Sequence, residues 1–313
     1  MPFTEPTPQT LTNPLLRLVL ATRPAFLSAS ALAALLGLAT AAYDGVAIGP
    51  ATAVLTVVGA MVVHAGINVL NDYYDALGGS DELNHDRIFP FTGGSRFIQN
   101  GVWSPRQMGR FGWGLLAMGS LIGGALVAVA GPGLLGIGLA GLVLGWAYSA
   151  RGVNLVGRGF GEVAVAVGFG VLVPLGADWV QRQAFAWTPL AAGVPFGLVA
   201  MNLLFVNQFP DHRADAAAGK RHWVVRLGPR RARWLYGAIA LGAHGGLVAA
   251  VAAGTLPPLA LLALVSLWPA SRAWLRLIRF AEVPAFLEPA IRRSISALVE
   301  LGVLLAGVLA VAG

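Results

Sequence analysis

Two clusters of acidic and amide side chains each read Asn-x-x-x-Asp with a further Asp three or four residues on, and each lies at the end of a long apolar run. They comprise Asn68, Asp72 and Asp75 in the first cluster and Asn207, Asp211 and Asp215 in the second. Carboxylates are costly at a membrane boundary because the charged form loses water. Two such clusters in one apolar chain therefore suggest a shared ligand that offsets this cost. The simplest candidate is a divalent cation carrying a polyanion such as diphosphate.

Helical geometry would place the members of each cluster on one face. Residues four apart lie on the same side of a helix, so Asn68 and Asp72 align, with Asp75 close by and His64 one turn deeper. If the two clusters face each other across a cavity, four carboxylates and two amides converge. Mg²⁺ prefers such oxygens and keeps other positions for water and phosphate. The alternative is a set of solvated loop acids, but loop acids have no reason to repeat one spacing.

Basic and small polar residues follow the two clusters. Lys220 is the only lysine among 21 basic residues, and its place after the second cluster suggests a compact ammonium for a phosphate oxygen. A chance lysine on a wet loop is the alternative. Arg87 follows the first cluster, and the Gly-Gly stretch at 92–95 either offers backbone N–H groups to an anion or forms a hinge. Tyr148 and Arg151 end another apolar run and add a hydroxyl and a guanidinium.

The composition indicates a membrane protein. The chain has 313 residues, of which 57% are hydrophobic and 11% charged, with a mean hydropathy of +0.72. A soluble domain has about 25% charged residues, so much of this chain must face lipid. The absence of cysteine excludes disulfides, thiolate metal sites and a cysteine nucleophile. The net charge is +7, but the chain has no run of basic residues interleaved with aromatic residues. The basic residues therefore indicate orientation in a membrane rather than nucleic-acid binding.

Apolar runs long enough to cross a bilayer occur nine times. A spanning helix needs roughly 20 apolar residues. The nine candidate spans lie near residues 24–43, 48–71, 110–130, 133–150, 160–177, 188–208, 233–253, 256–271 and 294–312. We therefore predict an all-α membrane protein, a nine-helix bundle formed by one domain over residues 1–313. Residues 1–13 are polar and rich in Pro and Thr, and we expect them to form a flexible N-terminal tail.

The basic residues predict the orientation of these spans. With nine spans, 20 of the 21 basic residues fall on one side, and only Arg182 falls on the other. The positive-inside rule makes the crowded side cytoplasmic, which places the N-terminus inside and the C-terminus outside. We expect a multi-pass protein of the cell (inner) membrane. Two long polar connections on the cytoplasmic side, at about 72–109 and 209–232, hold both clusters.

Two motifs resemble those of a known family. The stretch from Asn71 to Asp81 with Asp86-Arg87, and the stretch from Asn207 to Gly228, are similar to the paired motifs of the UbiA-type intramembrane aromatic prenyltransferases. The branch that uses 1,4-dihydroxy-2-naphthoate is the most similar. The resemblance spans nearly the whole chain. Pro210 within the second motif, and Tyr148-x-x-Arg151 in place of a Tyr-x-x-x-Lys pattern, are departures that leave the acceptor open.

The resemblance implies roles for individual residues. It implies that Asp72, Asp75, Asp211 and Asp215 bind Mg²⁺ and, with Lys220, perform catalysis. Lys220 and Arg87 would hold the diphosphate. The expected substrate contacts are Asn68, Asn71, Arg87, Asn207, Tyr148, Arg151, Glu162 and Arg226. The polar residues His64, Asn202 and Glu300 have no assigned role.

The expected reaction is transfer of a polyprenyl group from its diphosphate to an aromatic acceptor. The resemblance implies 1,4-dihydroxy-2-naphthoate as acceptor, in menaquinone biosynthesis, with 4-hydroxybenzoate and homogentisate as alternatives. The partners are thus a polyprenyl diphosphate, an aromatic acceptor and the lipid bilayer, without nucleic acid. A transporter that uses membrane carboxylates is the alternative from another class. Transporter sites lie near the bilayer midplane, whereas these clusters lie at helix ends beside long loops, which favours an enzyme.

Overall fold

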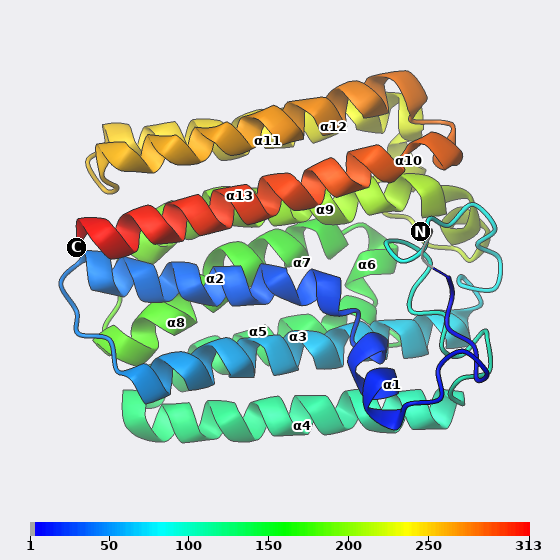
Figure 1. Cartoon of the computed structure of the whole chain (residues 1–313), viewed down its shortest axis with the longest axis horizontal. Coiled ribbons are helices and arrows are strands. Elements are labelled where there is room, and N and C mark those ends of the chain that lie inside the picture. Colours follow the sequence, from blue (N-terminus) through cyan, green and yellow to red (C-terminus); the bar gives the residue numbers. More distant parts are fainter. Residues whose placement is uncertain (1–3) are drawn as a thin grey trace.

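The computed structural model describes residues 4–313, and this part of the chain folds into helices without a β-strand (Figure 1). Nine helical segments of the described chain are long and apolar enough to span a membrane. They are α2 (Pro24–Tyr43), α3 (Pro50–Gly78), α4 (Pro105–Ala130), α5 (Pro132–Ser149), the broken helix Gly161–Arg182, α9 (Thr188–Ala217), α11 (Pro229–Ala252), the segment Pro258–Phe280 and α13 (Glu288–Ala312). The prediction of an all-α bundle with nine spans is confirmed.

Two of the spans change helical type along their length. The fifth span consists of α7 (Gly161–Val167), a π-helical turn η1 (Gly168–Leu172) and α8 (Val173–Arg182). The eighth consists of the 3₁₀ segment η2 (Pro258–Ser266) and α12 (Leu267–Phe280). Four short elements lie between the spans or before them. These are α1 (Pro14–Ala21), α6 (Leu155–Arg158), α10 (Trp223–Leu227) and η3 (Pro284–Phe286).

Prolines mark where many of the helices begin. Proline is favoured at the first helical position, because its fixed φ suits the helix and its missing N–H has no partner there anyway. The helices that begin with proline are α1, α2, α3, α4, α5 and α11. Ser104 adds a capping box before α4, in which its side chain and that of Gln107 satisfy each other's backbone N–H groups.

Several helices continue beyond their predicted apolar ends. α3 runs to Gly78 and α9 to Ala217, so both acidic clusters lie on the last turns of helices. The polar connections predicted at 72–109 and 209–232 therefore begin only at 79 and 218. Apolar length detects the part of a helix that lies in lipid, whereas backbone hydrogen bonds extend the helix into the polar region. Pro210 lies inside α9 without ending it.

The N-terminal segment differs from the predicted flexible tail. Residues 1–3 lie outside the described residues, but residues 4–13 contact the connection between α3 and α4. Glu5 forms an ion pair with Arg87, and Leu11 is buried in a small apolar cluster. The helix α1 follows and exposes most of its apolar residues. Its eight residues were too short to register as a predicted span.

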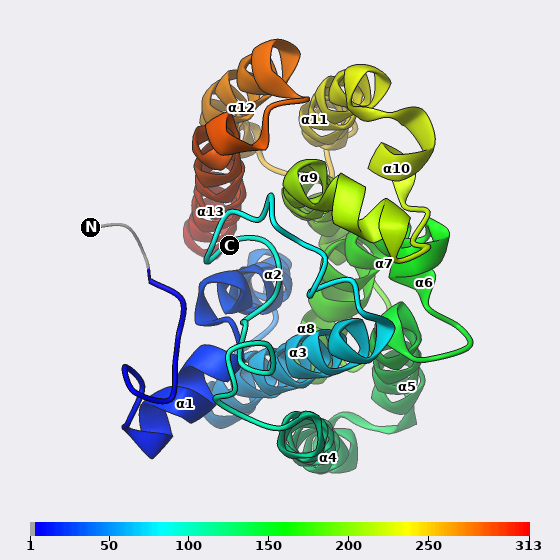
Figure 2. The ribbon, with the colours of Figure 1, turned by 90° about the vertical axis from the view of Figure 1, so that its right-hand side faces the viewer.

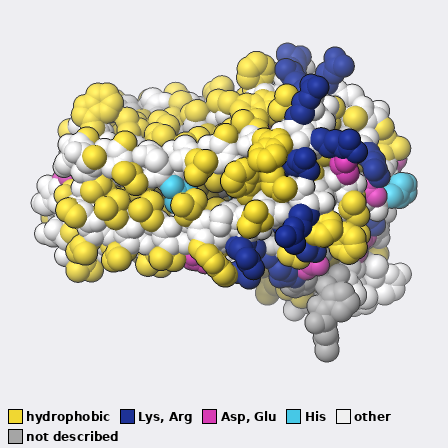
Figure 3. Space-filling model, turned by 90° about the horizontal axis from the view of Figure 1, so that it is seen from above, with side chains coloured by type: hydrophobic (Ala, Val, Ile, Leu, Met, Phe, Trp, Pro, Cys, Tyr) yellow, Lys and Arg dark blue, Asp and Glu magenta, His cyan; other side chains and the backbone are white. Residues whose placement is uncertain are grey.

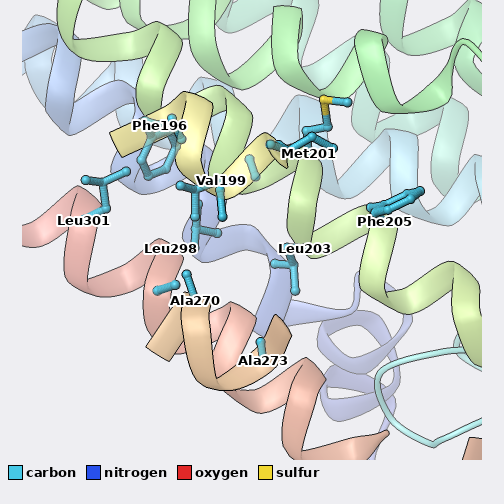
Figure 4. Close-up of a cluster of buried hydrophobic side chains, with 14 of the residues drawn as sticks. Phe196, Val199, Met201, Leu203, Phe205, Ala270, Ala273, Leu298 and Leu301 are labelled. Atoms are coloured by element: carbon cyan, nitrogen blue, oxygen red, sulfur yellow. The ribbon is translucent and has the colours of Figure 1, made fainter. Parts of the chain in front are cut away.

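The helix α9 forms the centre of the core. It packs against α2, α7, η1, α11 and α13. A larger share of its apolar stretch is buried inside the protein than in any other span. Figure 4 shows its side chains Phe196, Val199 and Leu203 facing Ala270 of α12 and Leu298 of α13. A helix so enclosed offers a rigid base for polar side chains at its end.

The fifth span approaches α9 very closely. A Cβ added at Gly170 of η1 would lie 2.8 Å from the Cα of Gly197, and a Cβ at Gly197 would lie 2.5 Å from the Cα of Gly170. These contacts leave no room for a side chain at either position. Small residues permit such approach of helices in lipid. Glycine packing therefore fixes the π-helical turn against α9.

Basic side chains gather at one end of the bundle. Figure 3 shows Lys and Arg concentrated at the end that carries α1 and the connection between α3 and α4. We call this the basic end. At the opposite end Arg182 forms ion pairs with Asp44 at 2.7 Å and Asp178 at 2.6 Å, which join α2 to α8. This separation matches the uneven distribution of basic residues read from the sequence.

Candidate functional site

A cavity of about 290 Å³ lies between the helices and extends to the basic end. Its walls come from α2, α3, α5, the fifth span and α9, and residues 80–94 of the α3–α4 connection lie at its polar end. Figure 2 looks onto this end and shows the connection crossing it between α3 and α9. The apolar lining includes Val63, Leu144, Phe169, Leu172 and Leu204. The cavity thus joins an apolar interior to a charged mouth.

Lys220 links the two acidic clusters directly. Its Nζ lies 3.0 Å from Oδ1 of Asp75 and 3.1 Å from Oδ1 of Asp215. Burial alone would lower the pKa of Lys220, but these two carboxylates outweigh burial and raise the pKa above its usual value. The lysine is therefore a fixed positive charge between α3 and α9. His222 completes the contact, with Nε2 lying 3.2 Å from Oδ2 of Asp215.

The α3–α4 connection ties the clusters together from the other side. Asn84 donates its side-chain amide to Oδ1 of Asp211 at 2.7 Å, and the backbone N–H of Ser95 donates to Oδ2 of Asp72 at 2.9 Å. The backbone N–H of Gly93 donates to Oδ2 of Asp211 at 3.4 Å. The sequence suggested that this Gly-Gly stretch offers N–H groups to an anion. In the structure the anions are the protein's own carboxylates.

Gly94 shows how tightly the connection covers these carboxylates. Its φ is 72°, a left-handed value that favours glycine. A Cβ at this position would lie 3.0 Å from Oδ1 of Asp72 and 3.1 Å from Oδ2 of Asp81. Any side chain at residue 94 would therefore press on both acids.

Asp81 is a fifth carboxylate at the site and was not among the predicted site residues. Its side chain is buried, and burial, followed by the nearby charges of Asp75 and Asp72, raises its pKa well above the usual range. Its backbone carbonyl accepts a hydrogen bond of 2.6 Å from Nη1 of Arg96, and Gln99 lies 3.3 Å from its Oδ2. The mouth of the cavity therefore holds one more carboxyl group than the two clusters alone predicted.

The oxygen atoms at this mouth suit a hard divalent cation. Asp75, Asp211 and Asp215 line the cavity, and the buried Oδ1 of Asn207 has no hydrogen-bond partner among the described residues. Within residues 4–313 no three His, Cys, Asp or Glu side chains come close enough to enclose a metal by themselves. Mg²⁺ does not need such a cage, because it usually takes one or two carboxylates and completes its shell with water and substrate phosphate. The donor set fits that mode of binding.

The structure brings eight of the predicted site residues to the cavity wall. They are Asn68, Asn71, Asp75, Tyr148, Asn207, Asp211, Asp215 and Lys220. Of these, Asn71 also donates to Oδ2 of Asp75 at 3.2 Å, which orients that carboxylate. His64, which had no assigned role, lines the same cavity and lies 3.2 Å from the hydroxyl of Ser30.

The other five predicted site residues do not line the cavity. Asp72 lies behind it, held by Ser95 and by Arg23 at 3.9 Å. Arg87 pairs with Glu5, and Arg151 donates to the carbonyl of Leu77.

Glu162 and Arg226 instead hold the segment around Lys220. Glu162 is fully buried and accepts the backbone N–H of Trp223 at 2.9 Å. Arg226 donates to the carbonyls of Arg221 and Arg158. Both residues stabilise the segment that carries Lys220 and His222, and neither faces the cavity.

Several residues at the cavity wall were not among the predicted site residues. They are Arg23, Asp81, Asn84, Gln208 and His222. Asp81, Gln208 and His222 lie within the two motif stretches, whereas Arg23 and Asn84 lie outside them and reach the site through the fold. For Gln208 a weak signal exists, since it is a buried amide beside Asn207, and neither of its side-chain polar atoms has a partner among the described residues.

Two relatives of this chain share one name. A 1,4-dihydroxy-2-naphthoate octaprenyltransferase of Mycobacterium tuberculosis is 31% identical over 184 residues, which cover 59% of this chain and 61% of that protein. The protein of the same name from Mycobacterium leprae is 29% identical over 261 residues, which cover 83% of this chain and 85% of that protein.

Solved structures and a family profile complete the comparison. A UbiA homolog from Archaeoglobus fulgidus bound to GPP and Mg²⁺ superposes with a TM-score of 0.58 at 16% identity, covering 94% of this chain and 99% of that one. At that identity the likeness establishes the fold. The profile of the UbiA prenyltransferase family matches residues 30–285, which is more than half of the chain. The chain therefore belongs to the UbiA prenyltransferase family.

Proposed function

We propose that this protein transfers a polyprenyl group from a polyprenyl diphosphate to an aromatic acceptor in an Mg²⁺-dependent reaction. The observation that carries the proposal is the arrangement of the cavity. Lys220 and the carboxylates of Asp75, Asp211 and Asp215 stand at its charged mouth, and apolar side chains line its interior. A diphosphate with its cation suits the mouth, and an apolar chain suits the interior.

The residues of the mouth have separate tasks in this reaction. Bound Mg²⁺ would neutralise the negative charge that grows on the departing diphosphate, held there by Asp75, Asp211, Asp215 and, from behind, Asp72. Lys220 lies between both clusters and would exchange a carboxylate for a phosphate oxygen when the substrate arrives. This exchange keeps the ammonium in a charge-assisted hydrogen bond throughout substrate binding.

The apolar part of the cavity protects the reactive carbon. The bond between the allylic carbon and the diphosphate oxygen breaks, and the resulting cation is shielded from water by residues such as Phe169 and Leu204. A ring carbon of the acceptor then forms the new carbon–carbon bond. The ring afterwards loses a proton or, in the case of a naphthoate, its carboxyl group as CO₂. Tyr148 lines the cavity and offers its hydroxyl to the acceptor.

We further propose 1,4-dihydroxy-2-naphthoate as the acceptor, which would make the reaction a step of menaquinone biosynthesis. The names of the two mycobacterial relatives support this choice. The direct test incubates purified protein with Mg²⁺, a polyprenyl diphosphate and each of three aromatic acids, and identifies products by mass. We expect a prenylated naphthalene product that has lost CO₂. A product formed only from 4-hydroxybenzoate or homogentisate would overturn the acceptor, and no product from any of them would overturn the function.

The carboxylates of the mouth give the next prediction. Asp211→Asn keeps the shape of the side chain but removes a ligand charge from the cavity wall, and we expect turnover to fall at least about a hundredfold. Asp72→Asn should behave in the same way if the acid behind the wall also supports the cation. Asp86→Asn is the matched control, because Asp86 forms only a partly exposed pair with Arg213 in the same region. Activity of Asp211→Asn equal to that of the control would contradict the model.

Lys220 provides a test of the substrate assignment. A charge-assisted hydrogen bond is worth about 1.5–3 kcal/mol, so Lys220→Ala should lower kcat/KM for the prenyl diphosphate by roughly ten- to a hundredfold. The KM of the aromatic acceptor should change little. Lys220→Arg should recover only part of the loss, because the guanidinium is larger and differently aimed. An increase confined to the KM of the acceptor would instead place Lys220 at the aromatic site.

The orientation in the membrane is a separate proposal. The concentration of basic residues at one end of the bundle supports a cytoplasmic mouth in the cell (inner) membrane, with the N-terminus inside and the C-terminus outside. Because the chain has no cysteine, Glu282→Cys creates a single exposed thiol at the basic end. We expect an impermeant thiol reagent to label it only after cells are permeabilised, whereas a reporter fused after Gly313 should behave as extracytoplasmic. Labelling of the introduced thiol in intact cells would reverse the orientation.

A further inference from the structure

Glu5 connects the N-terminal segment to three residues of the α3–α4 connection. Its Oε1 accepts a hydrogen bond of 2.6 Å from Nε of Arg87, and its Oε2 lies 3.1 Å from the amide of Asn100 and 3.7 Å from Nε of Arg96. The Glu5 side chain is 26% exposed and does not line the cavity. Burial would raise its pKa, but the bonds from Arg87 and Asn100 outweigh burial and lower the pKa, so the carboxylate is charged.

The partners of Glu5 lead on to the acidic residues of the site. Arg87 also donates through Nη1 to the backbone carbonyl of Asn84 at 2.6 Å, and the Asn84 side chain holds Asp211. Arg96 donates to the backbone carbonyl of Asp81 at 2.6 Å. One carboxylate outside the cavity is therefore linked through one or two side chains to both Asp211 and Asp81.

The N-terminal segment is itself anchored at the boundary of the bundle. Nε of Arg17, in α1, donates to the carbonyl of Leu11 at 2.6 Å, and Leu11 is buried beside Phe97 and Val102 of the α3–α4 connection. The helix α1 then exposes apolar side chains such as Leu15, which is 71% exposed. In a membrane protein such side chains partition into lipid, which fixes one end of the segment while Glu5 holds the other.

We propose that residues 4–21 form a strap, and that Glu5 is the positioning residue through which the strap holds the α3–α4 connection closed over the carboxylates. The inference rests on the proposed function, since the closed connection is what presents Asp211 to a diphosphate and its cation. Glu5 touches neither substrate nor metal. It acts through Arg87 and Arg96 by keeping Asn84 and Asp81 in place.

The strap has a definite kinetic consequence. Without Glu5 the connection samples open states, and substrate binding must first select the closed state. The apparent affinity for the prenyl diphosphate is then the affinity of the closed state multiplied by the fraction of molecules that are closed. The rate at saturating substrate, kcat, is unchanged. General loss of folded protein would instead lower kcat and leave KM as it was. The division between KM and kcat therefore separates positioning from mere stability.

The test compares Glu5→Gln with Glu82→Gln, which removes the same charge from an exposed residue of the connection. We expect Glu5→Gln to raise the KM of the prenyl diphosphate about three- to tenfold with kcat within about twofold, and Glu5→Asp to recover part of the effect. Glu82→Gln should match the unaltered protein. Equal KM values for Glu5→Gln and Glu82→Gln, or a loss confined to kcat, would overturn the proposal.

A double-mutant cycle then decides whether Arg87 acts through Glu5 or by binding the diphosphate itself. If it acts through Glu5, the Glu5→Gln/Arg87→Gln double variant should raise KM by less than the two single effects combined. The reason is that Glu5 then has only its contacts with Arg96 and Asn100 left to lose. Strictly additive effects would show that the two residues work separately and would overturn the strap.

Hydrogen–deuterium exchange provides a measurement that does not depend on activity. In the substrate-free protein in detergent, Glu5→Gln should speed amide exchange across residues 84–100 and leave the core of α9 unchanged, whereas Glu82→Gln should change neither. Unchanged exchange over 84–100 would overturn the strap. If the unaltered protein transfers no prenyl group while Glu5→Gln still loosens residues 84–100, the proposed function fails and the strap stands. If Glu5→Gln does not fold, Arg87→Gln replaces it in the same measurement.

Discussion

The crowding of negative charge at the basic end is the constraint on which the rest of this structure depends. Five carboxylates converge at one end of the cavity, and like charges in a partly dry site repel one another strongly. The raised pKa of Asp81 reflects burial first and that repulsion second. Without substrate, Lys220 and the backbone and amide N–H groups of the α3–α4 connection offset it. A bound divalent cation would offset it further, so the repulsion itself favours cation binding.

This arrangement needs two rigid helices and one adaptable connection. α3 and α9 carry the clusters on turns that extend beyond the apolar part of each helix, where water is near enough to reduce the cost of the charge. The connection between α3 and α4 lies over both helix ends and shares its N–H groups among their carboxylates. Its own position depends on the N-terminal segment. A segment before the first span thus contributes to the order of the site.

The mouth of the cavity must hold charge, whereas the interior of the bundle must exclude water. Glycines at 170 and 197 bring the fifth span against α9, and the π-helical turn at Gly168–Leu172 directs Phe169 and Leu172 to the cavity. Such single turns inside α-helices occur frequently at functional sites. The cavity consequently changes from charged to apolar along its length, as an amphipathic prenyl diphosphate does.

The sequence by itself determined the spans and the paired clusters, because lipid permits only long apolar helices here and because charges in such a chain are rare enough to stand out. Tertiary structure decided what apolar length cannot encode. It extended α3 and α9 past their apolar ends and moved Arg87, Arg151, Glu162 and Arg226 away from the cavity wall. It also brought Asp81, Asn84 and His222 to the cavity wall, and Asn84 holds Asp211 of a helix far away in the chain. Local spacing predicts which residues share one helix face, whereas packing and hydrogen bonding between elements decide what that face meets.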